Sequence, residues 1–80
     1  MRIPRNVTGD LLVRRLPRLG YQELRQRGSH KNMRTDIDGR YTVQVPMHKP
    51  IKTGMLESLL KKIAAHHHIS VDELIEKLDL

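Results

Sequence analysis

Apolar residues recur at helical spacing in two segments of this chain. In residues 11–19 four leucines fall largely on one stripe, with arginines around the outside. Residues 55–64 give the clearest core pattern, formed by Met55, Leu56, Leu59, Leu60, Ile63 and Ala64. Because these apolar positions are clustered and periodic, they predict a folded domain and not a disordered basic tail.

The bounds of the first helix follow from the residues that flank it. Thr8 is a suitable N-cap, and Gly20 suits the left-handed position after a helix end. Pro17 has no backbone N–H and disfavours helical geometry at the residue before it. We therefore expect a helix over about residues 9–18 whose last turn is kinked or lost.

Two more helices are expected in the second half of the chain. The first begins near Thr53 or Gly54 and carries the core pattern described above. The second is short, and it is opened by a capping box in which Ser70 precedes Glu73 by three residues.

Alternation with a period of two predicts three strands between the helices. Residues 21–27 and 30–36 flank a Gly28-Ser29 turn, Asp38-Gly39 is a strong hairpin signal, and Tyr41 to Val45 alternate apolar with polar. The expected fold is one α+β domain over residues 1–80. Its order is α-β-β-β-α, with a three-stranded antiparallel sheet covered on one face by helices, plus a short C-terminal helix.

Alternate residues of the middle strand point to opposite faces of the sheet, so odd and even positions form two groups. Met33 shares one parity with Lys31 and Thr35, and as the apolar residue it should face the helices. His30 has the other parity, together with Asn32 and Arg34. We therefore expect His30 on the open face of the sheet, unless a bulge at Gly28 or Ser29 inverts the alternation.

The positive charge is concentrated in the first half of the chain. Net charge is +6, and residues 1–35 carry nine Lys/Arg against two acidic residues, whereas the remainder carries six against seven. Solvated surfaces usually intersperse both signs, so this asymmetry favours a polyanionic partner. Nucleic acid is the favoured partner and an acidic protein the alternative, and one face can serve both.

Composition excludes several classes of protein. The chain has no cysteine, which removes disulfides and thiolate metal sites and suits a reducing cytoplasm. The first residues lack the apolar run of a signal peptide, and no segment approaches the roughly 18 to 20 apolar residues that span a bilayer. We therefore expect a soluble, cytoplasmic protein without a membrane partner.

The segment from Gln26 to Lys31 carries the strongest chemical signal. It places the imidazole of His30 after a Gly28-Ser29 turn and among the cations Arg27 and Lys31. Histidine titrates near neutral pH, so it can transfer a proton while neighbouring cations hold a polyanion. Such a motif alone is also typical of an ordinary turn between strands.

The chain resembles the HicA family of small toxins from toxin-antitoxin pairs. The likeness is carried by Arg5-Asn6-Val7-Thr8-Gly9, Leu19-Gly20-Tyr21, the run from Leu24 to His30, Val45-Pro46-Met47-His48, and the run from Ile51 to Leu56. It implies a fold similar to a double-stranded RNA-binding domain, cleavage of RNA, and neutralisation by a HicB antitoxin. It also implies that His30 is the catalytic residue. Pro17, Met55 and the triplet His66-His67-His68 depart from the family pattern.

On this basis we expect a metal-independent endoribonuclease that cleaves messenger RNA, needs no cofactor, and meets DNA only through its antitoxin. His30 supplies one proton transfer, and nearby cations neutralise charge on the phosphate. The residues expected to contact RNA are Arg25, Arg27, Gly28, Ser29, Lys31, Arg34, His48 and Lys52. With only two tyrosines as aromatic residues, the chain cannot stack many bases, so we expect little sequence specificity.

Several of these residues have a plainer interpretation. His48 is a second proton carrier, a phosphate contact, or a loop residue beside Pro46. Lys52 lies where the second helix begins, and every helix has such an anion-attracting end. Adjacent helical positions point about 100° apart, so His66, His67 and His68 do not converge on one ion, and we expect an exposed helix end there. Lys61 and Lys62 are expected to be solvated.

Two rival functions use the same basic face. One is a non-catalytic RNA-binding adaptor with the same fold, and the other is a DNA-contacting subunit of a repressor. No helix-turn-helix pattern supports the second rival. Cleavage of RNA in EDTA separates the toxin from the adaptor.

Overall fold

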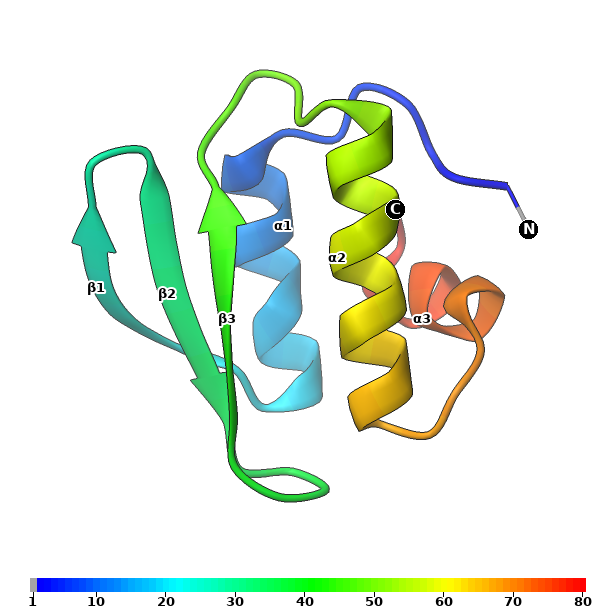
Figure 1. Cartoon of the computed structure of the whole chain (residues 1–80). Helices are drawn as coiled ribbons and strands as arrows, with labels where there is room; N and C mark the ends of the chain where they lie inside the picture. The colour runs from blue at the N-terminus through cyan, green and yellow to red at the C-terminus, as the bar shows by residue number, and fades with distance from the viewer. Residues whose placement is uncertain (1) are drawn as a thin grey trace.

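The elements follow the order expected from the sequence pattern. The computed structural model describes residues 2–80, in which α1 (Gly9–Arg15) precedes a three-stranded sheet and two further helices (Figure 1). The strands are β1 (Gln22–Arg27), β2 (His30–Thr35) and β3 (Tyr41–Pro46), and the helices are α2 (Thr53–His66) and α3 (Val71–Leu78). Both strand pairs are antiparallel and β2 is central. The expected α-β-β-β-α layout with a C-terminal helix is confirmed.

The first helix loses α-helical geometry in its last turn, as Pro17 predicted. Thr8 caps it as predicted, because its Oγ1 accepts a hydrogen bond from the N–H of Leu11 at 3.0 Å. The α-helix then ends at Arg15, and Pro17 lies in a four-residue 3₁₀ helix, η1 (Leu16–Leu19). The tighter turn fits a residue that has no N–H to donate. Gly20 ends η1 in the left-handed region, with φ of 79°.

Both predicted hairpin turns are present. Gly28 has a φ of 56°, and His30 begins β2 directly after the two-residue Gly28-Ser29 connection. At the other end of the sheet Asp38 and Gly39 have φ values of 59° and 100°. The connection between β2 and β3 runs over residues 36–40, and it reverses at Asp38 and Gly39 because Asp and Gly tolerate positive φ, which explains the Asp-Gly sequence.

The helices cover one face of the sheet, and α2 lies beside β3 while β1 forms the far edge (Figure 1). Met33 is fully buried, as its parity predicted. The apolar stripe of α2 supplies the centre of the core, where Leu56, Leu60 and Ile63 are at most 1% exposed. Within residues 2–80 no helix is long and apolar enough to cross a membrane.

Gly9 lets α1 approach the end of β3 at very short range. Its N–H donates to the carbonyl oxygen of His48 at 3.0 Å. A Cβ at this position would lie 2.6 Å from the Cα of Met47 and closer still to the carbonyl oxygen of Pro46. Both neighbours are backbone atoms, so the contact requires glycine.

Two arginines of the basic first half stabilise α3. Arg15 donates to the carbonyl oxygens of Leu78 and Asp79 at 2.9 and 2.6 Å, and it pairs with the Asp79 carboxylate at 3.3 Å. Arg18 donates to the carbonyl oxygen of Lys77 at 3.4 Å. Cations at a helix C-terminus satisfy its free carbonyls and its dipole. These two arginines therefore hold the last helix and lie apart from the sheet.

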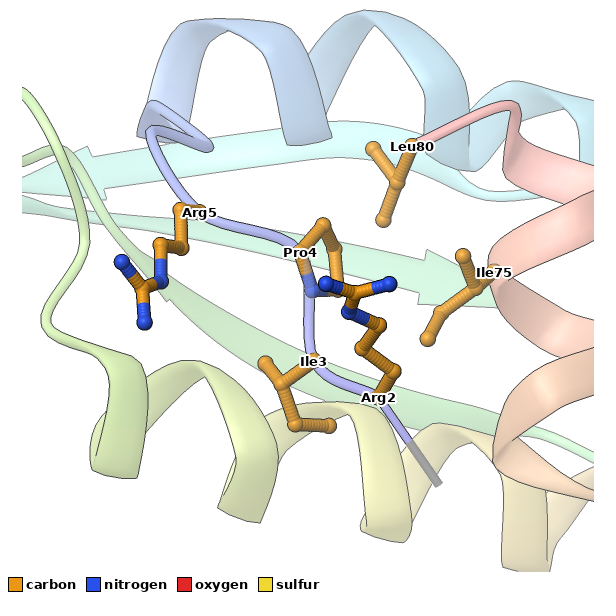
Figure 2. Close-up of a pocket in the computed structure, with 6 residues that line it drawn as sticks. All are labelled: Arg2, Ile3, Pro4, Arg5, Ile75 and Leu80. Atoms are coloured by element: carbon orange, nitrogen blue, oxygen red, sulfur yellow. The ribbon is translucent and has the colours of Figure 1, made fainter.

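The N-terminal segment and α3 enclose a hollow of about 630 Å³. Figure 2 shows its wall, with apolar side chains from Ile3, Pro4, Ile75 and Leu80 and two guanidinium groups from Arg2 and Arg5. None of the residues that line it belongs to the predicted site. It is therefore separate from the surface that carries His30.

Candidate functional site

His30 is the first residue of β2, and two strand pairings fix its position. Its Cα is partnered by Arg27 in β1 and by Pro46 in β3. The side chain is exposed, whereas Met33, which has the opposite parity, is buried. The prediction that His30 points to the open face is therefore confirmed. Backbone pairing fixes the position of His30 on both sides, and solvent can reach its ring.

The same face carries three cross-strand rows of side chains. The first row is Arg27, His30 and Pro46, the second includes Asn32 and Gln44, and the third is Gln22, Arg34 and Thr42. Directly opposite residues in antiparallel strands have Cβ atoms about 4.5–5.5 Å apart. Arg27 is thus the immediate cationic neighbour of His30, and Arg34 lies two rows along the same face.

The two-residue Gly28-Ser29 turn makes Arg27 that neighbour, and β1 contains a bulge further from the turn. The register shifts between Glu23 and Gln26, so Leu24 and Arg25 together lie opposite Asn32. The extra residue reverses the alternation of β1, so Arg27 and Gln22, which lie an odd number of positions apart, both pair with open-face residues of β2. The bulge also places Arg25 at an irregular point of the edge strand, and no sequence pattern predicted this irregularity.

Lys31 lies on the opposite face from His30. Its Nζ is 2.7 Å from Oε1 of Glu23. Both residues line a hollow of about 460 Å³ that α1 closes with Asp10 and Arg14. The structure therefore does not bring Lys31 together with His30, although the two residues are adjacent in sequence, because consecutive strand residues point to opposite faces.

His48 and Lys52 belong to the connection between β3 and α2. His48 is half-buried, and its backbone carbonyl receives the hydrogen bond from Gly9. Lys52 is exposed at the N-cap of α2 and makes no side-chain capping bond. Neither residue lines the hollow that contains His30.

That hollow has a volume of about 330 Å³ and lies between the open face and α2. It is lined by His30, Gln44, Pro46, Met55, Ser58, Leu59 and Lys62. Gln44, Ser58 and Lys62 were not among the predicted site residues. Gln44 was detectable, because it alternates with the buried Val43 and Val45. Lys62 could not be identified from the sequence, because it lines the hollow only through the packing of α2 beside β3.

The interpretation of His66-His67-His68 as an exposed helix end is wrong for its middle residue. The His67 side chain is only 3% exposed. Its Nε2 lies 3.0 Å from the Tyr21 hydroxyl and its Nδ1 lies 3.1 Å from Oδ2 of Asp38. Burial, with a smaller effect of Tyr41, raises the pKa of Tyr21, so its hydroxyl keeps its proton within this hydrogen bond. The carboxylate oxygen of Asp38 accepts from Nδ1–H.

His66, the preceding histidine, contacts the same Asp38-Gly39 turn. His66 is half-buried, and its Nε2 donates to the carbonyl oxygens of Ile37 and Gly39 at 3.0 and 2.9 Å. Its ring stacks on Tyr41 with centroids 4.5 Å apart. The histidines at the end of α2 therefore tie the Asp38-Gly39 hairpin to the helix. Among residues 2–80, no group of three or more His, Cys, Asp or Glu side chains is placed to hold a metal ion.

Comparison with known proteins places this α+β chain in a family. The family model described as the HicA toxin of bacterial toxin-antitoxin systems matches residues 9–64, which is more than two thirds of the chain. The protein therefore belongs to the HicA toxin family, as its sequence suggested. Searches of curated proteins and of solved structures found no significant match. Toxins of this family are generally ribonucleases, and membership implies an antitoxin partner.

Proposed function

We propose that this protein is a toxin that cleaves messenger RNA without a metal ion and arrests translation. The observation that carries the proposal is the placement of His30, which is exposed at the start of β2 with Arg27 as its cross-strand neighbour. Toxins of this family are generally ribonucleases, which supports the interpretation of His30 and Arg27 as groups that act on RNA. The whole of residues 1–80 is proposed to act as one toxin domain in the cytoplasm.

RNA contains its own nucleophile, which is why one imidazole on an open surface is sufficient to begin the chemistry. A base removes the proton of the 2′-hydroxyl, O2′ bonds to phosphorus, and the bond from phosphorus to O5′ breaks as O5′ takes up a proton. The products are a 2′,3′-cyclic phosphate and a 5′-hydroxyl. His30 performs one of these two proton transfers, which typically contribute about 100- to 10,000-fold each.

The cations on the open face have an electrostatic role. Arg27 lies beside His30 and stabilises negative charge that builds on the phosphate oxygens. The Gly28-Ser29 turn leaves space for a phosphate, since nothing lies within 4 Å of where a Gly28 side chain would begin. Arg34 extends the positive surface along β2, and Arg25, His48 and Lys52 add contacts to RNA at its edges. Lys31, paired with Glu23 on the other face, contributes mainly to long-range attraction.

The antitoxin is proposed to be a HicB-type protein that covers the same open face. An acidic surface would complement Arg27 and Arg34 and would block access to His30 at the same time. DNA would then be contacted only through the antitoxin.

Incubation of the purified toxin with an RNA oligonucleotide in EDTA tests the proposal against the adaptor. We expect cleavage at an undiminished rate, because no step requires a metal ion. A protein that only retards intact RNA in a native gel would be an RNA-binding adaptor, and the proposed function would be wrong.

A further inference from the structure

A groove between β3 and α2 leads away from His30. The His30 hollow shares Gln44, Leu59 and Lys62 with a second hollow of about 290 Å³. The other residues that line the second hollow are Tyr41, Thr42 and Val43 of β3. The two hollows therefore form one continuous depression, which we name the β3–α2 groove, running along the free edge of the sheet from His30 to Tyr41.

We propose that the β3–α2 groove holds the single-stranded RNA next to the phosphodiester that is cut. This inference rests on the proposed function and adds a substrate subsite to it. The groove begins at His30, so a nucleotide seated in it would be joined directly to the reacting phosphate. None of the residues that gave the family likeness, apart from His30, Pro46 and Met55, lines this groove.

The floor and walls of the groove suit a nucleotide. Met55 is 43% exposed, and with the half-buried Leu59 it offers an apolar surface on which a base can lie. The Gln44 side-chain amide carries both a donor and an acceptor, so it can pair with the edge of a base. Tyr41 is half-buried with one face of its ring stacked on His66, and Tyr21 is buried, so the tyrosines offer little ring surface to a base. The expected base preference is therefore modest and depends on Gln44.

Lys62 provides the charge for a phosphate. Among residues 2–80 it has no ion-pair partner, whereas its neighbour Lys61 lies 2.8 Å from Oε2 of Glu57. Adjacent residues of a helix point about 100° apart, so the two lysines face different directions. Lys62 borders both hollows of the groove and Lys61 borders neither. The chain thus contains a matched pair of lysines, of which Lys62 lines the β3–α2 groove and Lys61 does not.

Charge and shape favour RNA over a protein strand in this groove. An added β-strand would pair with the free edge of β3 and would leave the Lys62 ammonium and the His30 ring without a role. Single-stranded RNA uses the whole groove, because it presents bases to the apolar floor and phosphates to Lys62 and Arg27.

Binding of a 2′-O-methyl RNA strand, which cannot be cut, tests the groove without relying on activity. Lys62→Ala is expected to weaken binding about tenfold and to lower the slope of log affinity against log salt by about 0.7, the loss of one phosphate contact on a single strand. Lys61→Ala should leave both quantities unchanged. Equal effects of the two variants would overturn the proposal, as would a Lys62→Ala protein that loses antitoxin binding alone.

Cleavage of substrates that differ only in the base beside the cut provides the second measurement. Gln44→Ala is expected to reduce the differences among the four bases while the protein remains folded and active. An unchanged ranking and spread would place Gln44 outside the subsite. If the unaltered protein does not cut RNA, the proposed function itself fails; if it cuts and only these variants lack their effects, the groove alone is wrong.

Discussion

Replacing His30 with alanine is expected to lower the rate of RNA cleavage by about 100- to 10,000-fold, the range of one positioned proton transfer. The side chain is exposed and makes no hydrogen bond with other residues in the range 2–80, so its removal should not disturb the sheet. Initial rates on an RNA oligonucleotide measure the loss, and thermal melting followed by circular dichroism confirms the fold. The variant should still bind its antitoxin.

A second histidine provides the control for this experiment. His68 is exposed beyond the end of α2, with a φ of 57°. Asparagine tolerates that backbone conformation, so His68→Asn removes an imidazole without strain. This variant should cleave RNA at the original rate. A folded His30→Ala protein that cleaves as fast as His68→Asn would show that His30 takes no part in the reaction.

The largest effect on stability is expected from Gly9→Ala. The added methyl group would overlap the backbone of Pro46 and Met47, and backbone atoms cannot move aside as a flexible side chain can. Overpacking of this kind typically costs about 1–3 kcal/mol in the free energy of unfolding, and contact with backbone places the cost at the upper end. The same segment of β3 pairs with Ser29 and His30, so cleavage should fall as well. Urea unfolding measures the first effect and initial rates the second.

Gly54→Ala is the matched substitution. Gly54 lies in the first turn of α2, and nothing lies within 4 Å of where its Cβ would be. Alanine is favoured over glycine in a helix by about 0.5–1 kcal/mol, so this variant should be as stable as the original or more so. If Gly9→Ala were as stable as Gly54→Ala, the close approach of α1 to β3 would be wrong.

Local sequence signals predicted most of the fold. Thr8 and Ser70 satisfy backbone N–H groups within three residues of themselves, and the two turns require positive φ at particular glycine positions. These interactions involve neighbours in sequence, so a pattern can reveal them. The orientation of His30 followed in the same way, because the period of two in β2 is fixed by the buried Met33.

The features that could not be predicted from the sequence depend on contacts between distant segments. The bulge at Leu24 and Arg25 puts Gln22 on the same face as Arg27, and only the pairing of β1 with β2 defines it. His67 is buried because it meets Tyr21 and Asp38, which lie 46 and 29 residues away. Arg15 is one of the cations of the basic first half, and its guanidinium donates to the carbonyl oxygen of Leu78, which lies 63 residues later. Pattern analysis of one segment at a time does not detect such partners.

An oligonucleotide of DNA that contains a single ribonucleotide gives the most direct test of the central claim, which is that His30 moves a proton while the substrate's own 2′-hydroxyl attacks the phosphate. In EDTA, the protein should cut this strand only on the 3′ side of the ribonucleotide, leave a 2′,3′-cyclic phosphate, and spare the all-DNA strand. Cleavage of the all-DNA strand, or products with a 5′-phosphate, would contradict the account.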